Sequence, residues 1–190
     1  MPDFSKRSDT QSLKKMRVWF GSPEQATQCK QKAALAMHLA QINIGRVLGG
    51  PDDPRMKDFF ANLARVNALA ERMPGFVWRL KDATGIGAMG LHWPGDPTMN
   101  VNMSVWESAD ALGKFVFQTV HRNIYARKHE FFETPSRPTV CMWWIDAGHI
   151  PTLDEAKERL DHYVAHGPSE FAFGWSDLPS AKLWHEKRCA

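Results

Sequence analysis

Polar and aromatic side chains that could bind and activate a small molecule alternate with apolar ones along residues 100–106. Asn102, Ser104 and Trp106 share one face of the strand that this alternation predicts, and the residues between them are apolar. Amide, hydroxyl and indole groups gathered on one face are costly to bury without partners. The spacing therefore predicts that this face lines a pocket.

A long helix is predicted directly after this strand, with Ser108 as its N-cap and its end near Phe132. At about 100° per residue its apolar positions form two stripes on nearly opposite sides. The first contains Leu112, Phe115, Val116, Thr119 and Val120, and the second contains Phe117, His121, Tyr125 and Phe132. Because a surface helix needs one apolar face, the second stripe predicts a partner subunit, a covering tail or a ligand. His121 and Tyr125 are either an interface pair with satisfied hydrogen bonds or part of a catalytic or cofactor-binding site.

The remaining pattern gives the elements that must position these residues. Strands are expected at 38–47, 76–81 and 139–146, helices at 53–73 and 152–166, and a loop rich in Gly and Pro at 82–98. On the first strand Gln41 and Asn43 share a face with Leu39, and the last strand contains Trp144.

The order β-α-β-β-α-β with an additional helix predicts an α+β fold of the ferredoxin-like, split βαβ type with a four-stranded antiparallel sheet. Its helices cover one sheet face and leave the other bare. We expect the bare face to display Gln41, Asn43, Asn102, Ser104, Trp106 and residues of the last strand. We also expect Asn43 to lie close to Trp106, because the first and third strands are central neighbours in this fold.

The length of 190 residues fits one ordinary domain. Residues 1–36 are polar and basic and are expected to form a loosely ordered N-terminal extension, which could also be a partner-binding arm. The domain is expected at 37–175, followed by a C-terminal tail at 176–190, and the apolar run 171–175 is expected to dock on the domain.

Several functions are disfavoured by composition and spacing. A net charge of +3 gives no reason to expect nucleic acid, and the sequence predicts no membrane span. Cys29, Cys141 and Cys189 are scattered, which favours a reducing cytoplasm over a disulfide framework. The G-x-G-x-x-G match at 85–90 is followed by a Pro-rich run in place of the helix that a dinucleotide requires. His162 and His166 lack an evident third metal ligand, so no metal site is expected.

Residues 37–174 resemble a bacterial domain-of-unknown-function family of dimeric α+β barrel proteins. The resemblance is carried by the segments 38–44, 66–70, 74–79, 102–108, 121–122 and 143–151. This family is related to the antibiotic-biosynthesis and heme-degrading monooxygenases, in which two subunits pack sheet to sheet and each sheet and its helices enclose a pocket. The resemblance thus implies a homodimer and a small-molecule ligand.

Heme-degrading relatives carry an Asn on the first strand, a Trp in a Trp-Glu-Ser turn and a His on the following helix. Asn43, Trp106 and His121 match these by element and residue type, although His121 comes about one helical turn earlier than their heme ligand. These three residues are the predicted catalytic set. The predicted substrate-binding set is Gln41, Asn102, Ser104, Phe117, Tyr125 and Trp144.

Two functional hypotheses remain at this stage. The first is an oxygenase acting on a small hydrophobic or aromatic molecule, either without a cofactor or with heme held by His121. The second is a dimeric ligand-binding or structural module without catalysis.

Overall fold

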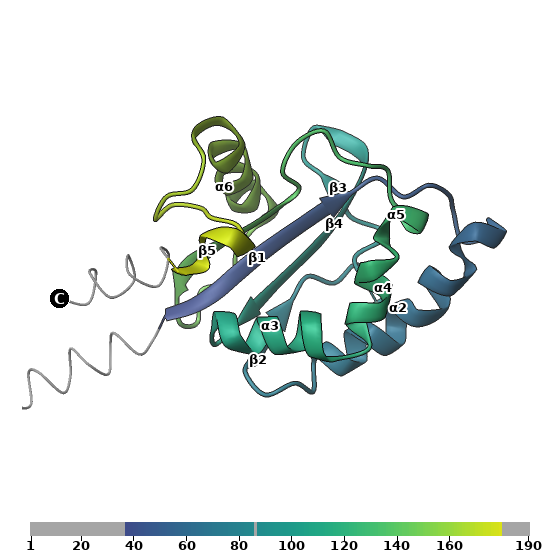
Figure 1. Cartoon of the computed structure of the whole chain (residues 1–190), viewed down its shortest axis with the longest axis horizontal. Helices are drawn as coiled ribbons and strands as arrows, with labels where there is room; N and C mark the ends of the chain where they lie inside the picture. Colours follow the sequence, from purple (N-terminus) through teal and green to yellow (C-terminus); the bar gives the residue numbers. More distant parts are fainter. Residues whose placement is uncertain (1–36, 86, 180–190) are drawn as a thin grey trace, which may run out of the picture.

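The computed structural model describes residues 37–85 and 87–179 (Figure 1). The predictions for residues 1–36, for Cys29 and Cys189, and for the tail from residue 180 onward lie outside the described residues.

The predicted ferredoxin-like α+β fold is confirmed by the strand order. One antiparallel sheet has the order β2-β4-β1-β5, and β3 pairs with β4 outside this path. The two central strands, β1 and β4, are therefore the first and third of the four long ones, as expected. The strands are β1 (Met37–Gly45), β2 (Phe76–Arg79), β3 (His92–Trp93), β4 (Asp96–Trp106) and β5 (Val140–Asp146). The helices are η1 (Pro54–Met56), α2 (Lys57–Ala70), α3 (Ala109–Gln118), α4 (His121–Ala126), α5 (Lys128–Phe131), α6 (Leu153–His166) and η2 (Trp175–Asp177).

The alternation of the strands produces two sheet faces of different chemistry. Gln41 pairs with Ser104, and Asn43 pairs with Asn102, so their side chains form one polar row across β1 and β4. We call the face that carries this row the amide face. The opposite, aliphatic face consists of Ala40, Ile42, Ile44, Val101, Met103, Val105, Cys141, Trp143 and Ile145, all of them buried.

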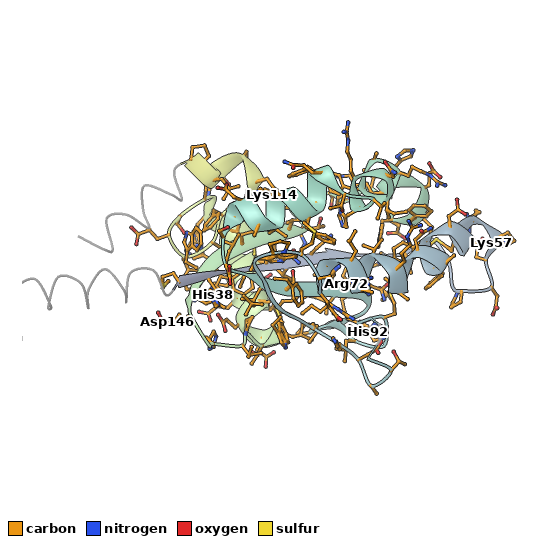
Figure 2. All side chains as sticks on the ribbon, turned by 90° about the horizontal axis from the view of Figure 1, so that it is seen from below. His38, Lys57, Arg72, His92, Lys114 and Asp146 are labelled. Atoms are coloured by element: carbon orange, nitrogen blue, oxygen red, sulfur yellow. The ribbon has the colours of Figure 1, made fainter. Side chains whose placement is uncertain are left out.

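The prediction that the amide face is the bare one is wrong. Helices α2 and α3 pack over the amide face, where Leu112 and Phe115 of α3 join Leu39 and Trp106 in one cluster. The aliphatic face is covered by α6, through Ala156 and Leu160, and by the β3 hairpin. Figure 2 shows α3, which carries Lys114, on one side of β1 and the β3 segment, which carries His92, on the other. A sheet-to-sheet dimer through the amide face is excluded in this arrangement, because helices of the same chain occupy that face.

The additional helix α6 is fixed to the sheet by polar as well as apolar contacts. Thr152 caps the helix by accepting a hydrogen bond from the Glu155 backbone N–H at 3.1 Å. The indole N–H of Trp143 donates to the Glu155 carboxylate at 2.8 Å, and the His149 ring lies 2.7 Å from its other oxygen. The predicted extra C-terminal helix is thereby confirmed.

The expected loop at 82–98 contains a short hairpin that the sequence pattern did not show. Strand β3 pairs with β4 through a turn at Pro94-Gly95, and Gly95 has a φ of +87°. Proline followed by a glycine with positive φ is typical of a type II turn. The turn positions Trp93, which is buried against the aliphatic face. The chain after Gly90 leads into this hairpin, not a helix, as the sequence predicted.

The single long helix predicted after Ser108 is broken into α3, α4 and α5. The break is at Thr119, whose backbone is extended, with φ −119° and ψ −175°. Its hydroxyl donates to the Phe115 carbonyl at 2.7 Å and accepts from the His121 backbone N–H at 3.2 Å. The hydroxyl thus takes the place of backbone hydrogen bonds that a continuous helix would form. Threonine side chains often bond to the local backbone in this way.

The chain after α6 returns to the sheet, as the apolar run 171–175 predicted. Phe173 is fully buried and exchanges two backbone hydrogen bonds with Met142 of β5, at 2.8 and 3.0 Å. Leu178 also packs into the cluster beneath α3. In both figures the last described residues lie near the start of β1.

Candidate functional site

A cavity of about 180 Å³ lies between the amide face and helices α2, α3 and α4. Seven of the nine predicted site residues line it: Gln41, Asn43, Asn102, Ser104, Trp106, His121 and Tyr125. We call this space the inner cavity.

The floor of the inner cavity is a hydrogen-bonded polar row. Gln41 Nε2 donates to Ser104 Oγ at 2.9 Å, and Trp106 Nε1 donates to the same oxygen at 2.9 Å. Asn43 and Asn102, the next pair on the same face, are exposed, and their side chains do not hydrogen-bond to Gln41 or Ser104. The predicted proximity of Asn43 to Trp106 is not met, because Trp106 pairs with Leu39. Four strand residues separate Leu39 from Asn43, which corresponds to about 13 Å.

Trp106 closes one end of the inner cavity. Its ring is fully buried, stacks on Phe115 with centroids 5.3 Å apart, and meets Phe76 edge-on at 5.3 Å. The helix that follows starts as predicted, since Ser108 caps α3 by accepting from the Ala111 N–H at 3.1 Å. Because its indole N–H is engaged by Ser104, Trp106 supplies a flat aromatic wall and no free donor.

His121 enters the cavity wall because the helix breaks just before it. Its Nδ1 lies 3.3 Å from the Val116 carbonyl oxygen, and the ring packs on Phe115 at 4.9 Å. A carbonyl only accepts, so Nδ1 carries the proton and the lone pair of the neutral ring is on Nε2. Burial lowers the pKa of His121 below its ordinary value of 6.5, against the smaller opposing effect of the Val116 hydrogen bond. A neutral imidazole with an available Nε2 is the form that a general base requires.

Three residues of the second predicted stripe remain in contact across the helix break, but they do not all line the cavity. Tyr125 stays beside His121, with ring centroids 6.2 Å apart, and lines the cavity with it. Phe117, still on α3, meets Tyr125 edge-on at 6.1 Å from the other side, is 41% exposed and also packs edge-on against Trp175 at 5.0 Å. Phe117 therefore lies outside the cavity where sequence reasoning expected it to bind substrate.

Trp144 also lies outside the cavity. Trp144 is on the amide face, as predicted. However, β5 is an edge strand, and the segment around Phe173 covers Trp144 at that edge. Its ring centroid is 6.1 Å from that of Phe173, and it belongs to the cluster beneath α3.

Sequence reasoning missed several polar lining residues. Arg79, only 8% exposed, lines the cavity from β2 and is held by Glu71 at 2.8 Å. Asn62 and Asn67 line it from α2. A signal for these asparagines exists, because they fall three or four residues from Phe59, Leu63, Val66 and Ala70, on the apolar stripe of that helix.

A second hollow of about 480 Å³ adjoins the inner cavity at the end of β1. The two share Asn43, Gly45, Tyr125, Phe132 and Val140. We call it the outer hollow. Phe132 can lie between the two because Gly45 has no side chain, and a Cβ there would stand 2.8 Å from the Phe132 ring.

The inner cavity does not fit heme. Its volume of about 180 Å³ is below the roughly 300–1,000 Å³ typical of cofactor and small-molecule sites. Nε2 of His121 has no hydrogen-bond partner among the described residues, but the cavity that it borders is too small for a porphyrin. No cluster of three or more His, Cys, Asp or Glu suited to a metal ion occurs among residues 37–85 and 87–179. In the same residues no helix is long and apolar enough to cross a membrane.

An α+β domain of ferredoxin-like topology with an internal, partly polar cavity is the class that the fold and site define. The model of a family described as a domain of unknown function, DUF3291, matches residues 38–189. The chain belongs to this family, which confirms the resemblance to a domain-of-unknown-function family.

Solved structures similar to this chain include oxygenases. The cofactor-independent oxygenase SnoaB from Streptomyces nogalater is 20% identical, with 60% of this chain and 97% of SnoaB covered and a TM-score of 0.36. The ActVA-Orf6 monooxygenase from Streptomyces coelicolor, solved with nanaomycin D, is 19% identical, with coverages of 62% and 95% and a TM-score of 0.33. A protein of unknown function from Nitrosomonas europaea is 12% identical, with coverages of 62% and 97% and a TM-score of 0.37. No curated protein matches significantly. Likenesses with scores this low do not establish a shared function.

Proposed function

We propose that the protein binds a small phenolic molecule in the inner cavity and oxidises it with dioxygen without a cofactor. The observation that carries this proposal is the state of His121: a half-buried, neutral imidazole whose Nδ1 is held by the Val116 carbonyl and whose Nε2 has no partner among the described residues. Aromatic walls from Trp106 and Phe115 and a floor of amides complete a site for a flat, polar-edged ring.

His121 Nε2 takes the proton of the phenol hydroxyl, and the resulting phenolate is electron-rich enough to reduce dioxygen. Oxygen adds to the ring carbon para to the phenolate oxygen, that carbon loses its hydrogen, and the O–O bond breaks. One oxygen atom remains as a second ring carbonyl, and the other leaves as water. Phenol and dioxygen thus give quinone and water, with all four electrons supplied by the substrate and no external reductant.

The amides of Gln41, Asn43 and Asn102 act on the reduced oxygen in this scheme. They line the floor below the substrate, where N–H donors favour negative charge that develops on oxygen. Ser104 fixes the orientation of Gln41 by their 2.9 Å hydrogen bond.

The test is oxygen uptake by the purified protein with 1-naphthol, which has a hydrogen para to its hydroxyl, under ¹⁸O-labelled dioxygen. We expect one labelled oxygen in the quinone product, and a loss of at least about a hundredfold in rate in His121→Gln, because the general base is removed. His166→Gln is the matched control, since His166 is exposed at the end of α6. Equal rates in wild type and His121→Gln would overturn the role of His121.

A non-catalytic ligand-binding module is the second candidate. The small volume of the inner cavity favours it, because about 180 Å³ is less than most enzyme pockets enclose. Naphthol that binds without oxygen uptake would support this candidate.

A homodimer remains a separate proposal, supported by the resemblance in sequence to dimeric proteins. Because the inner cavity is complete within one chain, we expect turnover per chain to be unchanged when the protein is diluted below its dimerisation range. Sedimentation velocity over a concentration series measures that range.

A further inference from the structure

The outer hollow differs from the inner cavity in the charge of its walls. Arg46, Lys128, His129 and Arg137 line it, against the single carboxylate of Glu133. The ammonium of Lys128 forms no ion pair with a described residue and lies 4.7 Å from the centre of the Tyr125 ring. Since Tyr125 lines both spaces, this cation is held where they meet.

The other two permanent cations are incompletely neutralised. Arg46 Nη2 pairs with Asp96 at 2.9 Å, but its Nε is buried without a hydrogen bond, with Glu133 3.7 Å away. Arg137 is paired only distantly, at 4.0 Å from Asp161. The walls of the outer hollow therefore retain donors and positive charge.

The wall formed by residues 132–139 is held in place by the end of β1. The Glu133 N–H donates to the Arg46 carbonyl at 2.9 Å, and the Ile44 N–H donates to the Thr139 carbonyl at 2.9 Å. Upstream, the Leu48 N–H donates to the Phe131 carbonyl at 2.9 Å, which fixes α5 beside the end of β1 (Figure 1). Backbone bonds at three positions make this a preformed wall, and preformed sites bind with less ordering cost.

The two spaces follow the direction of β1 in sequence. Trp106, which pairs with Leu39, closes the inner end, and Arg46 stands at the outer end. Seven strand residues separate Leu39 from Arg46, which corresponds to about 23 Å. The two spaces meet at Asn43, Gly45 and Tyr125, and Lys128 lies beside Tyr125, so a flat ring in the inner cavity can present an anionic group on its outward edge to the outer hollow without spanning that full length.

We infer that the ligand is an aromatic oxyanion, whose ring occupies the inner cavity and whose carboxylate, or a phosphate in its stead, occupies the outer hollow against Lys128, Arg137 and Arg46. This inference rests on the proposed binding of an aromatic molecule and adds the chemical class of that molecule. It does not depend on whether oxidation follows.

The test compares hydroxynaphthoic acid with its methyl ester by quenching of tryptophan fluorescence and by calorimetry near neutral pH. The two probes share one ring system and differ in one negative charge. We expect the full-length wild-type protein to bind the acid about tenfold more tightly than the ester, the size of effect expected for one charge-assisted contact. Naphthyl phosphate is the third probe, and tighter binding than that of the acid would identify a phosphate as the preferred oxyanion.

Variants assign the effect to the outer hollow. Lys128→Gln and Arg137→Gln should each reduce affinity for the acid and leave affinity for the ester unchanged, while Lys128→Arg should retain the preference. Lys114→Gln is the matched control, because Lys114 is exposed on α3 away from both spaces. The ester serves as an internal check that each variant is folded.

The outcomes separate this inference from the proposed function. If the wild type binds acid and ester equally, the oxyanion site is overturned and the aromatic cavity stands. If the acid is preferred but neither Lys128→Gln nor Arg137→Gln changes this, the assignment to the outer hollow is overturned. If neither probe binds, the proposed aromatic cavity fails and the inference fails with it.

Discussion

Ser104 shows how one hydroxyl can organise a site. By accepting from both Gln41 and Trp106, at 2.9 Å each, its oxygen connects two strands and the aromatic end wall. This hydrogen bond fixes the long side-chain amide of Gln41 in one orientation. At residue scale the inner cavity is therefore ordered before any ligand enters, which lowers the cost of binding.

The depressed pKa of His121 predicts a specific loss of stability in acid. Above pH 6.5 the ring is neutral in both the folded and the unfolded chain. As the pH falls below 6.5 toward the lower folded pKa, the unfolded chain takes up a proton that the folded protein does not, so the free energy of unfolding decreases. Urea unfolding of wild type and His121→Gln at several pH values measures this, and the variant should lose less stability across that window.

His166→Gln is the control for this prediction, since the His166 ring is exposed. A loss in His121→Gln as steep as in the wild type would show that burial does not lower the His121 pKa. Under the proposed function the acid limb of kcat/KM should likewise lie below pH 6.5, where the base becomes protonated.

Cys141 is predicted to resist alkylation in the folded protein. Its side chain is fully buried in the aliphatic face, and burial raises the pKa of its thiol to about 12, so the reactive thiolate is scarce. Mass spectrometry after iodoacetamide treatment should find the Cys141 peptide unlabelled in buffer and labelled in urea. Fast labelling in buffer would mean that β5 opens readily.

Most residues of the inner cavity could be predicted from the sequence, but the predicted positions of Phe117 and Trp144 in the cavity, and of Asn43 beside Trp106, were wrong. Alternation along β1 and β4 was sufficient to place Gln41, Asn43 and Ser104 on one face. Arg79 could not be found in this way, because an arginine in a short strand normally reaches solvent, and its burial here depends on bonds to Glu71 and to the Leu80 and Gly85 carbonyls that the local pattern does not show.

At the scale of elements, the turn between α2 and β2 is the most constrained. Gly75 has a φ of +82°, its carbonyl accepts from the Glu107 N–H at 2.8 Å, and a Cβ there would lie 2.6 Å from Ala111 Cβ. This glycine lets α3 approach the start of β2 closely.

We predict that Gly75→Ala destabilises the fold by more than the backbone strain alone. A non-glycine residue at positive φ costs about 1–3 kcal/mol, and here the contact with Ala111 adds to it. Gly148→Ala is the matched control, because Gly148 has a φ of +90° and no atom within 4 Å of the added Cβ. Thermal unfolding should show a larger loss of stability in Gly75→Ala than in Gly148→Ala. Equal losses in the two variants would show that the contact with Ala111 contributes nothing.

The break between α3 and α4 could not be read from periodicity. Residues 109–131 continue an apolar helical pattern, and Thr119 is an ordinary helix residue by propensity. Its hydrogen bonds to Phe115 and His121 depend on the local fold, and they turn His121 toward the same side as Phe115. The existence of the elements was thus predictable, whereas the direction of the functional side chain was not.

At the scale of the molecule, both sheet faces are closed by the same chain. The sequence could not decide which face the helices cover, since each face carries apolar residues and the covering depends on where α6 and the tail dock. The large apolar residues that remain exposed within the described residues, Leu48, Phe117, Val120, Tyr125 and Ile150, do not include the aliphatic face.

The segment 171–178, which packs on β5 and beneath α3, is predicted to unfold together with the rest of the domain. Phe173→Ala removes a fully buried ring and should cost about 3–5 kcal/mol. Phe117→Ala, whose ring is 41% exposed, should cost much less. Chemical denaturation measures both, and similar values would show that residues 171–178 are dispensable.

The return of the tail to β5 has a practical consequence. The first and last described segments lie on the side of the molecule where β1 starts, in both views, whereas the outer hollow is lined by Arg46, directly after the other end of β1. A fluorophore or surface linkage attached at the first or the last described residue is therefore remote from the outer hollow. Immobilised protein should bind the naphthyl probes as the free protein does, which makes surface-based screening for the natural ligand practical.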